Sequence, residues 1–399
     1  MLLMPIARWM GLRYIGSSAA ALTLLVMMLQ LLTGWLFGFI SNTYLAIGEL
    51  HRGAVWQNVQ RLVAMTALAA FLWARAPFPV LALTQLASMV LFTVIVLVEI
   101  RFRAPVLVPS LRYGNFQHMM GVLKPSAYYM LYGFSGFLCW QGPVLLLQKF
   151  LGPAAVAVFA VNRTIFNMAR QAIIIFTNSI QQENIQLIAR RSWNQLRRMY
   201  DLSERVVLFL NPASTVGALL ACPFLLAVWL HKRGLYDPGV CAMMAAISAV
   251  MALRHHKWSF QYLSNRHEKI AKFNIAVYAG MTVFTALTLR MWGIHAYLAA
   301  WLAAELLICV YVIRQNQLLF PPEFRPSLGP LPRFAVFLAA AFGLAAWPVW
   351  HDSAWPLHRV AAVAVCAVIV LMTFSYFIFG LNKLKAVFET RLRRRFAAR

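Results

Sequence analysis

A long apolar segment near the middle of the chain carries a stripe of polar and cationic side chains. On a helical wheel at about 100° per residue, five of them share one face: Arg163, Asn167, Arg170, Asn178 and Gln181. An arginine facing lipid costs at least about 2.5–3.5 kcal/mol on insertion scales. The stripe therefore predicts a wet cavity. The alternative is that these arginines reach backbone carbonyls or lipid headgroups near a helix end.

The residue types on this stripe favour an anionic ligand. A guanidinium stays charged and forms paired hydrogen bonds to phosphate oxygens. Gln141, which lies deep in the preceding apolar segment, is expected to face the same cavity. We therefore expect these six residues to bind substrate, with phosphate as the group that the arginines hold.

Glu305 is the one acidic residue deep within a predicted span. Because burial disfavours the charged form of a carboxyl group, Glu305 could couple transport to an ion such as a proton. The alternative is a structural carboxyl group that is neutral or paired with a neighbouring arginine. The basic run from Arg254 to Lys257, at a predicted helix end, is expected to face anionic lipid or to meet a phosphate.

Composition separates two classes of strongly basic protein. The 399 residues are 62% hydrophobic and 12% charged, with a net charge of +25. A nucleic-acid-binding protein would display this charge on a solvated face, but the chain has too few charged residues to form a polar surface. A polytopic membrane protein fits instead. The five cysteines lie at least 19 residues apart, and we see no nucleotide-binding motif, so we expect no metal, disulfide or cofactor.

Eleven segments are apolar and long enough to approach the length of a membrane span. The predicted fold is therefore all-α, and no connection is long enough for a soluble catalytic domain. The predicted spans cover residues 17–40, 60–75, 79–99, 127–148, 154–182, 206–231, 238–256, 271–291, 294–314, 333–350 and 359–381.

The distribution of basic residues predicts the orientation of these spans. Of 36 Lys and Arg residues, 26 fall in connections on one side and eight on the other, while Arg163 and Arg170 lie within a span. The richer side is expected to be cytoplasmic, which places the C-terminus inside and residue 1 outside. The segment 186–205 is expected to lie on the cytoplasmic surface, and the basic tail 391–399 is expected to bind anionic lipids.

Two loops indicate an internal repeat. At an offset of 216 residues, the loop 48–58 aligns with the loop 264–274, so that His51 meets His267 and Asn58 meets Asn274. Both loops follow one span and precede another. The first three spans are therefore expected to repeat as the seventh to ninth, and parallel repeats of six spans occur in transporters.

The segment Gln148–Gln171, together with the loop Tyr44–Asn58, resembles the oligosaccharide-lipid flippases. These belong to the superfamily that also contains multidrug and toxin extruders. The resemblance implies two six-helix lobes followed by two helices. It also implies that the first three helices of such a protein are missing here. The expected domains are a partial lobe at 1–112, a complete lobe at 113–325, and two further spans with a basic tail at 326–399.

The function that these observations predict is transport. The chain is expected to move an undecaprenyl-pyrophosphate-linked oligosaccharide from the inner to the outer leaflet of a bacterial inner membrane, by alternating access and without enzymatic chemistry. Its expected partners are this lipid-linked oligosaccharide, anionic membrane lipids and other polysaccharide-assembly proteins of the membrane, and not nucleic acid. The alternatives are a drug or cation exporter, a membrane glycan polymerase or ligase, and an inactive truncated remnant.

Overall fold

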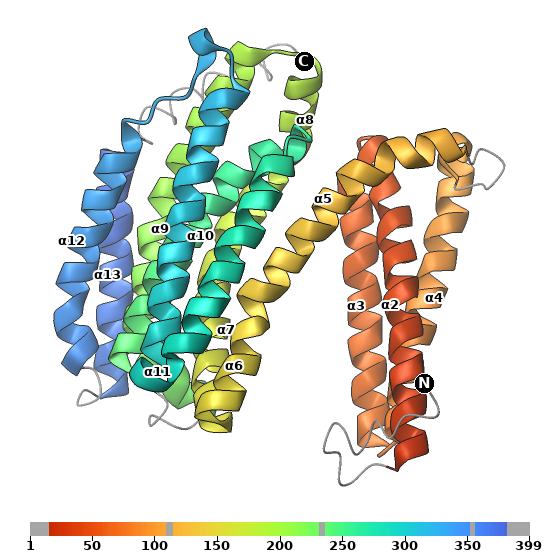
Figure 1. Cartoon of the computed structure of the whole chain (residues 1–399), viewed down its shortest axis with the longest axis horizontal. Coiled ribbons are helices and arrows are strands. Elements are labelled where there is room, and N and C mark those ends of the chain that lie inside the picture. The colour runs from red at the N-terminus through yellow and green to blue at the C-terminus, as the bar shows by residue number, and fades with distance from the viewer. Residues whose placement is uncertain (1–15, 109–114, 231–235, 352–355, 381–399) are drawn as a thin grey trace. The chain divides into compact units, whose positions relative to one another are not determined.

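The computed structural model describes residues 16–108, 115–230, 236–351 and 356–380 (Figure 1). Throughout these ranges every regular element is helical, as predicted. The short 3₁₀ helices are Pro105–Leu107 and Pro322–Phe324. The α-helices are α2 (Ser17–Ala46), α3 (Leu50–Trp73), α4 (Phe78–Arg103), α5 (Phe116–Trp140), α6 (Gly142–Leu151), α7 (Pro153–Ser179), α8 (Gln181–Ala189), α9 (Trp193–Leu230), α10 (Pro238–Leu263), α11 (Glu268–Leu319), α12 (Pro330–His351) and α13 (Leu357–Ile378).

The length and hydropathy of these helices identify a multi-pass membrane protein. In the part of the chain that the structure describes, eight helices are long and apolar enough to cross a bilayer. Helix α11 is counted once among these eight, and neither α3 nor α7 is among them. A helix lies at each of the eleven predicted segments. The number of spans nevertheless stays a prediction, because length and composition single out only eight helices. The basic tail 391–399 lies outside the described residues.

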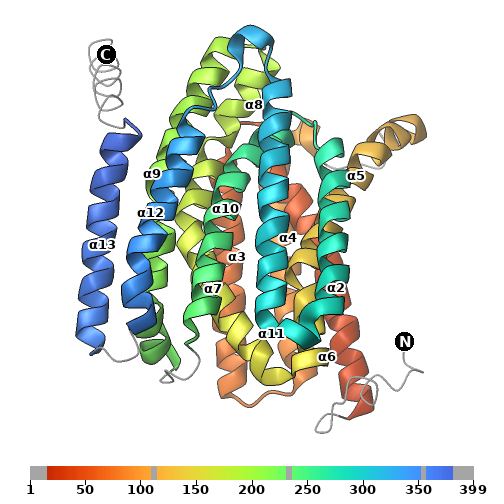
Figure 2. The ribbon, with the colours of Figure 1, turned by 60° about the vertical axis from the view of Figure 1, so that its left-hand side comes forward.

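Helix α11 is a hairpin of two antiparallel arms, 268–292 and 294–319. The chain reverses at Gly293, whose φ of 60° and ψ of −151° are not helical. Figure 2 shows the two arms side by side. In a continuous helix, Tyr278 and Glu305 would be separated by about 40 Å. Instead, the Tyr278 hydroxyl donates a hydrogen bond to Glu305 at 2.6 Å. The arms correspond to the predicted segments 271–291 and 294–314.

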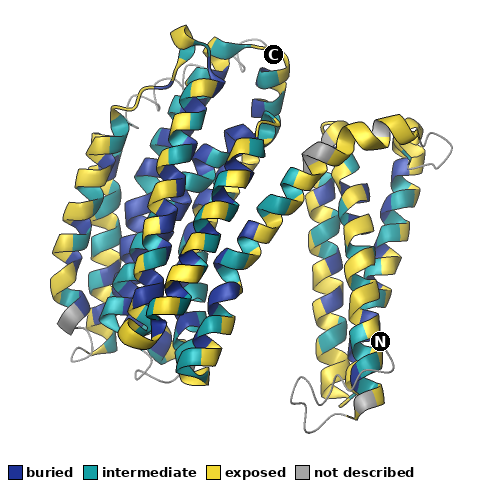
Figure 3. Cartoon of the chain, in the orientation of Figure 1, coloured by how far each residue is buried: buried dark blue, intermediate teal, exposed yellow. Residues whose placement is uncertain are grey.

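The chain divides into two compact units, Met1–Met119 and Met120–Arg399. In the second unit, α10 packs against α7, α9 and α11, and much of its surface is buried (Figure 3). Helices α12 and α13 pack on α9. A side chain at Gly217 of α9 would overlap Val368 of α13, so a residue without a side chain is needed where these helices approach closely.

The first unit consists mainly of α2, α3 and α4, which pack against one another. Its small core includes Phe37, Tyr44, Phe92 and Val96. At one end of α4, Glu99 accepts hydrogen bonds from Arg52 and Trp56 and pairs with Arg103 at 3.1 Å. This polar cluster ties α3 to α4.

The burial pattern of α4 supports the predicted repeat. Helix α4 ends at Arg103 and α11 ends at Leu319, an offset of 216 residues. At this offset, each buried residue of α4 has a buried counterpart in the second arm of α11. The buried α4 residues are Leu81, Ala82, Ser88, Phe92, Val96 and Ile100, and their counterparts are Tyr297, Leu298, Ala304, Ile308, Val312 and Asn316. The two segments therefore present the same face to their neighbours.

Two segments on the basic side differ in extent from the predicted spans. The predicted span 206–231 begins too late, since its helix already starts within the segment 186–205. Helix α8 ends at Ala189, Arg191 has a positive φ of 52°, and α9 begins at Trp193. Leu196 and Tyr200 of α9 are buried against Phe260. Helix α10 likewise continues to Leu263, beyond the predicted end at residue 256.

Candidate functional site

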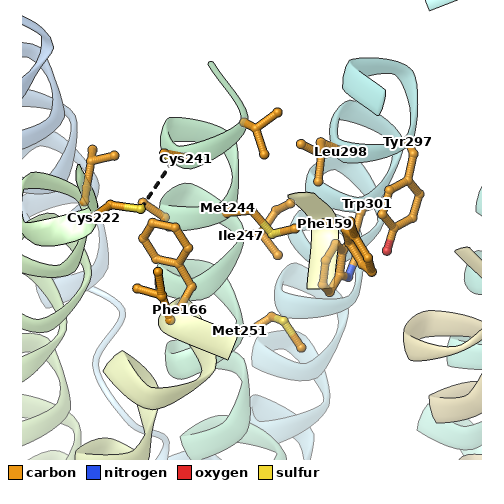
Figure 4. Packing of buried hydrophobic residues seen from close by; sticks show 14 of the residues in the cluster. Phe159, Phe166, Cys222, Cys241, Met244, Ile247, Met251, Tyr297, Leu298 and Trp301 are labelled. Carbon is orange, nitrogen blue, oxygen red and sulfur yellow. Dashed lines mark hydrogen bonds between the residues drawn. The ribbon is translucent and has the colours of Figure 1, made fainter. Parts of the chain in front are cut away.

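Arg163, Asn167 and Arg170 line one small hollow inside the second unit. The hollow has a cavity volume of about 10 Å³, which is room for about one water molecule. Helix α5 contributes Trp140 to its wall, and the second arm of α11 contributes Trp301. The remaining wall is largely apolar and is formed by Phe166, Met244, Ile247, Ser248 and Met251. Figure 4 shows the apolar packing around this region.

The two arginines flank the same aromatic ring. The guanidinium carbon of Arg163 lies 6.0 Å from the centre of the Trp140 ring, and that of Arg170 lies 5.5 Å from it. Arg163 donates a hydrogen bond to the Trp140 carbonyl at 2.8 Å, while Arg170 donates to the Asn167 side chain. Arg170 is 8% exposed. Both cations are therefore held by neutral groups, which leaves their charge uncompensated at these contacts.

Hydrogen bonds from two neighbouring helices set the rotation of α7. The side-chain oxygen of Asn162 accepts from the thiols of Cys241 at 3.1 Å and Cys222 at 3.5 Å. The two sulfur atoms lie 3.4 Å apart (Figure 4). One turn further along α7, the Phe166 carbonyl accepts from Ser248 at 3.0 Å. These contacts fix the helix face that carries Arg163 and Arg170.

Glu305 lies one turn beyond the hollow and is 0% exposed. One of its oxygens, Oε1, accepts from Tyr278 at 2.6 Å and from Trp301 at 3.1 Å. The other, Oε2, lies 2.8 Å from Nε of Arg254 on α10. Of the two readings of Glu305 from the sequence, the structure therefore favours a paired carboxyl group. It also corrects the expected position of Arg254, whose side chain is only 11% exposed and does not face lipid headgroups.

The ionised groups around the hollow are unbalanced. Arg170 interacts electrostatically with both Arg254 and Glu305. Arg163, Arg170 and Arg254 therefore share this interior with one carboxylate, and two positive charges remain in excess. Charge interactions are much stronger in such surroundings than in water. This excess is what an anionic ligand would neutralise.

A second buried ion pair joins α9 to α10, and the sequence analysis missed it. Lys257 donates a hydrogen bond to Glu204, and each residue is 1% exposed. The ammonium nitrogen also lies 4.4 Å from the centre of the Tyr200 ring. One residue before Lys257, His256 bonds to Ser203 at 2.7 Å. Both Lys257 and His256 were expected to be solvated, but α10 continues past them and its neighbours cover them.

The other three predicted binding residues do not line the hollow. Helix α7 ends at Ser179, and the chain bends at Ile180 before α8 begins at Gln181. Gln181 lies beyond this bend, and Asn178 lies in the last turn of α7, about two turns past Arg170. The two side chains bond to each other at 2.8 Å on the surface. Gln141 is exposed in the short break between α5 and α6.

No group of His, Cys, Asp or Glu residues that could hold a metal ion occurs among the described residues. Comparison with known proteins gave no match, since no family model fits the chain and no curated protein or solved structure was found to be similar.

Proposed function

We propose that the chain is a membrane transporter that moves an undecaprenyl-pyrophosphate-linked oligosaccharide from the inner to the outer leaflet of a bacterial inner membrane. The observation that carries this proposal is the excess of positive charge around Arg254, buried Arg170 and half-buried Arg163. Buried charges are normally paired. A pyrophosphate group would supply the missing negative charge.

Arginine is suited to this task because it keeps its charge at any physiological pH and presents two parallel N–H groups to phosphate oxygens. The aromatic rings of Trp140 and Trp301, 5.3 Å apart, form a wall beside the cations. Such a wall excludes water and strengthens the attraction for an anion. A drug or cation exporter would need the opposite sign of charge at this place.

The size of the hollow bears on the transport cycle. A cavity volume of about 10 Å³ is too small for an oligosaccharide or for a pyrophosphate group. Under this proposal the surrounding helices separate first, and the arginines then hold the pyrophosphate while the glycan enters. Alternating access of this kind places the binding site near the middle of the membrane. The proposal includes a cytoplasmic C-terminus, which the distribution of basic residues predicts.

Substitution of the arginines tests the proposal. Glycan export would be measured in a strain that depends on this chain for export. We expect the double variant Arg163→Gln/Arg170→Gln to abolish export. Lysine at both positions should retain part of it, because the charge survives without the paired donors. The control is Arg359→Gln, at an exposed position on α13. Normal export by the double glutamine variant, at wild-type protein levels, would refute the proposal.

A further inference from the structure

The Arg254–Glu305 ion pair is placed where it can sense an anion in the hollow. Met251 and Trp301 line the hollow. Arg254 follows Met251 by three residues on α10, and Glu305 follows Trp301 by four residues on α11, so each lies one helical turn further on. The indole nitrogen of Trp301 donates directly to Glu305 at 3.1 Å. One contact therefore separates the carboxylate from the wall of the site.

The two members of the pair are held unequally. Glu305 has two directed hydrogen bonds on Oε1, from Tyr278 and Trp301, that do not involve Arg254. The contact between Arg254 Nε and Glu305 Oε2 is close, at 2.8 Å, but neither atom makes a directed hydrogen bond. Glu305 would thus keep two donors if Arg254 turned away, so the ion pair can open without stripping the buried carboxylate of its partners.

Among the described residues, one other cation interacts with Glu305. Tyr132 and Cys139 face it from α5, Arg170 from α7, and Tyr278 from the first arm of α11. Arg170 already bonds to Asn167 and lines the hollow. Arg254 does not line the hollow and is paired with Glu305 instead, so it is the cation that opening of this pair would make available to the site.

We propose that Glu305 is an internal competitor for the transported anion: it holds Arg254 while the site is empty and gives it up when a phosphate group binds. This inference rests on the proposed function, because it needs an anion in the hollow. It assigns Glu305 a positioning role that sets affinity, and it makes Arg254 the third guanidinium of the loaded site. Binding would then change the contact between α10 and α11.

The second ion pair provides a matched control. Lys257 and Arg254 lie three residues apart on α10, and each pairs with a buried carboxylate from a neighbouring helix. Glu204 belongs to α9 and is not among the residues that line the hollow. Glu204→Gln therefore removes the same charge and strands a similar cation. It should not release a group that can reach the anion.

The experiment is a binding titration of inorganic pyrophosphate to the full chain purified in detergent. Charge-assisted hydrogen bonds are among the strongest in proteins. We therefore expect Glu305→Gln to lower the dissociation constant by about tenfold or more. Glu204→Gln should change it by less than about threefold, since any effect there acts only at a distance. If the glutamine variant does not fold, Glu305→Asp takes its place. Because its side chain is shorter, it should lower the dissociation constant by an intermediate amount.

A double-mutant cycle separates competition from a general effect of charge. If Glu305 acts by holding Arg254, Glu305→Gln should have little effect in an Arg254→Gln background. An equal gain in both backgrounds would overturn the inference, as would an unchanged or weaker affinity of folded Glu305→Gln. Both of these results would contradict the role of Glu305 alone. The proposed anion site would still be supported if pyrophosphate binds the wild type and Arg163→Gln/Arg170→Gln abolishes that binding. If pyrophosphate binds to no form of the protein, the anion site and the inference both fail.

Discussion

The Glu204–Lys257 ion pair allows a quantitative test of the buried polar core. Both side chains are almost fully buried, and Lys257 also contacts the Tyr200 ring. Replacing Lys257 with methionine keeps most of the side-chain volume but leaves Glu204 without its cation. Removing one partner of a buried pair costs about 3–5 kcal/mol. We therefore expect Lys257→Met to lower the free energy of unfolding by that amount.

The double variant Glu204→Leu/Lys257→Met should restore most of this loss. Replacing both members of a buried ion pair with apolar residues is often neutral or stabilising, because neither ion must then be desolvated. We expect the double variant to lie within about 1 kcal/mol of the wild type. Unfolding of the purified chain in detergent, followed by intrinsic tryptophan fluorescence, would give both values. A double variant that loses as much stability as Lys257→Met, or more, would refute the reasoning, since removal of the carboxylate would then relieve nothing.

Three further predictions concern packing and orientation. Gly217→Val should destabilise the protein by about 1–3 kcal/mol in unfolding measurements, because the new side chain overlaps α13; Gly343→Val, where a side chain has open space, should lose less. Cys241→Ala should cost about 0.5–1.5 kcal/mol, because Asn162 loses its closer thiol donor but keeps Cys222, whereas the same change at exposed Cys366 should have little effect. Reporter fusions should be active outside the cytoplasm after Arg75, Lys149 and Arg290, and inside after Arg198 and Lys269. Opposite results at two of these five sites would contradict the predicted orientation.

Much of the helical framework could be predicted because apolar length is a strong signal. The reversal within α11 is an example. Gly293 separates two apolar segments, and glycine readily adopts the positive φ that the reversal needs. The predicted arms were correct to within a few residues. The approach of Tyr278 to Glu305 could not be predicted, because it depends on how the two arms pack and not on either segment alone.

The residues of the predicted stripe lie together only along the regular part of the helix. Arg163, Asn167 and Arg170 came together because fewer than two turns of α7 separate the first from the last. Gln181 did not join them because the chain bends at Ile180, where neither glycine nor proline marks the end of the helix, and Asn178 did not because it lies about two turns beyond Arg170. A helical wheel therefore predicts which residues share a face over about two turns. It fails where a helix ends without a glycine or proline in the sequence.

Polar residues near helix ends were the main source of error. Glu204 and Lys257 were placed in solvated connections because charged residues usually mark the end of a span. In the structure they lie within long helices and satisfy each other. Two charges of opposite sign on adjacent helices can remain buried, but single-sequence patterns do not show which charges will meet.

The shared pattern of α4 and the second arm of α11 has a consequence for protein engineering. At the offset of 216 residues, the first copy has Gly38, Ser41 and Met89 where the second has Arg254, Lys257 and Glu305. At these three positions the first copy is thus uncharged and the second is charged within a single chain. The uncharged copy suggests replacements that suit the same local geometry, such as methionine for Glu305. Grafting residues between the copies would show which parts of the shared pattern serve folding alone and which were added for a specialised task.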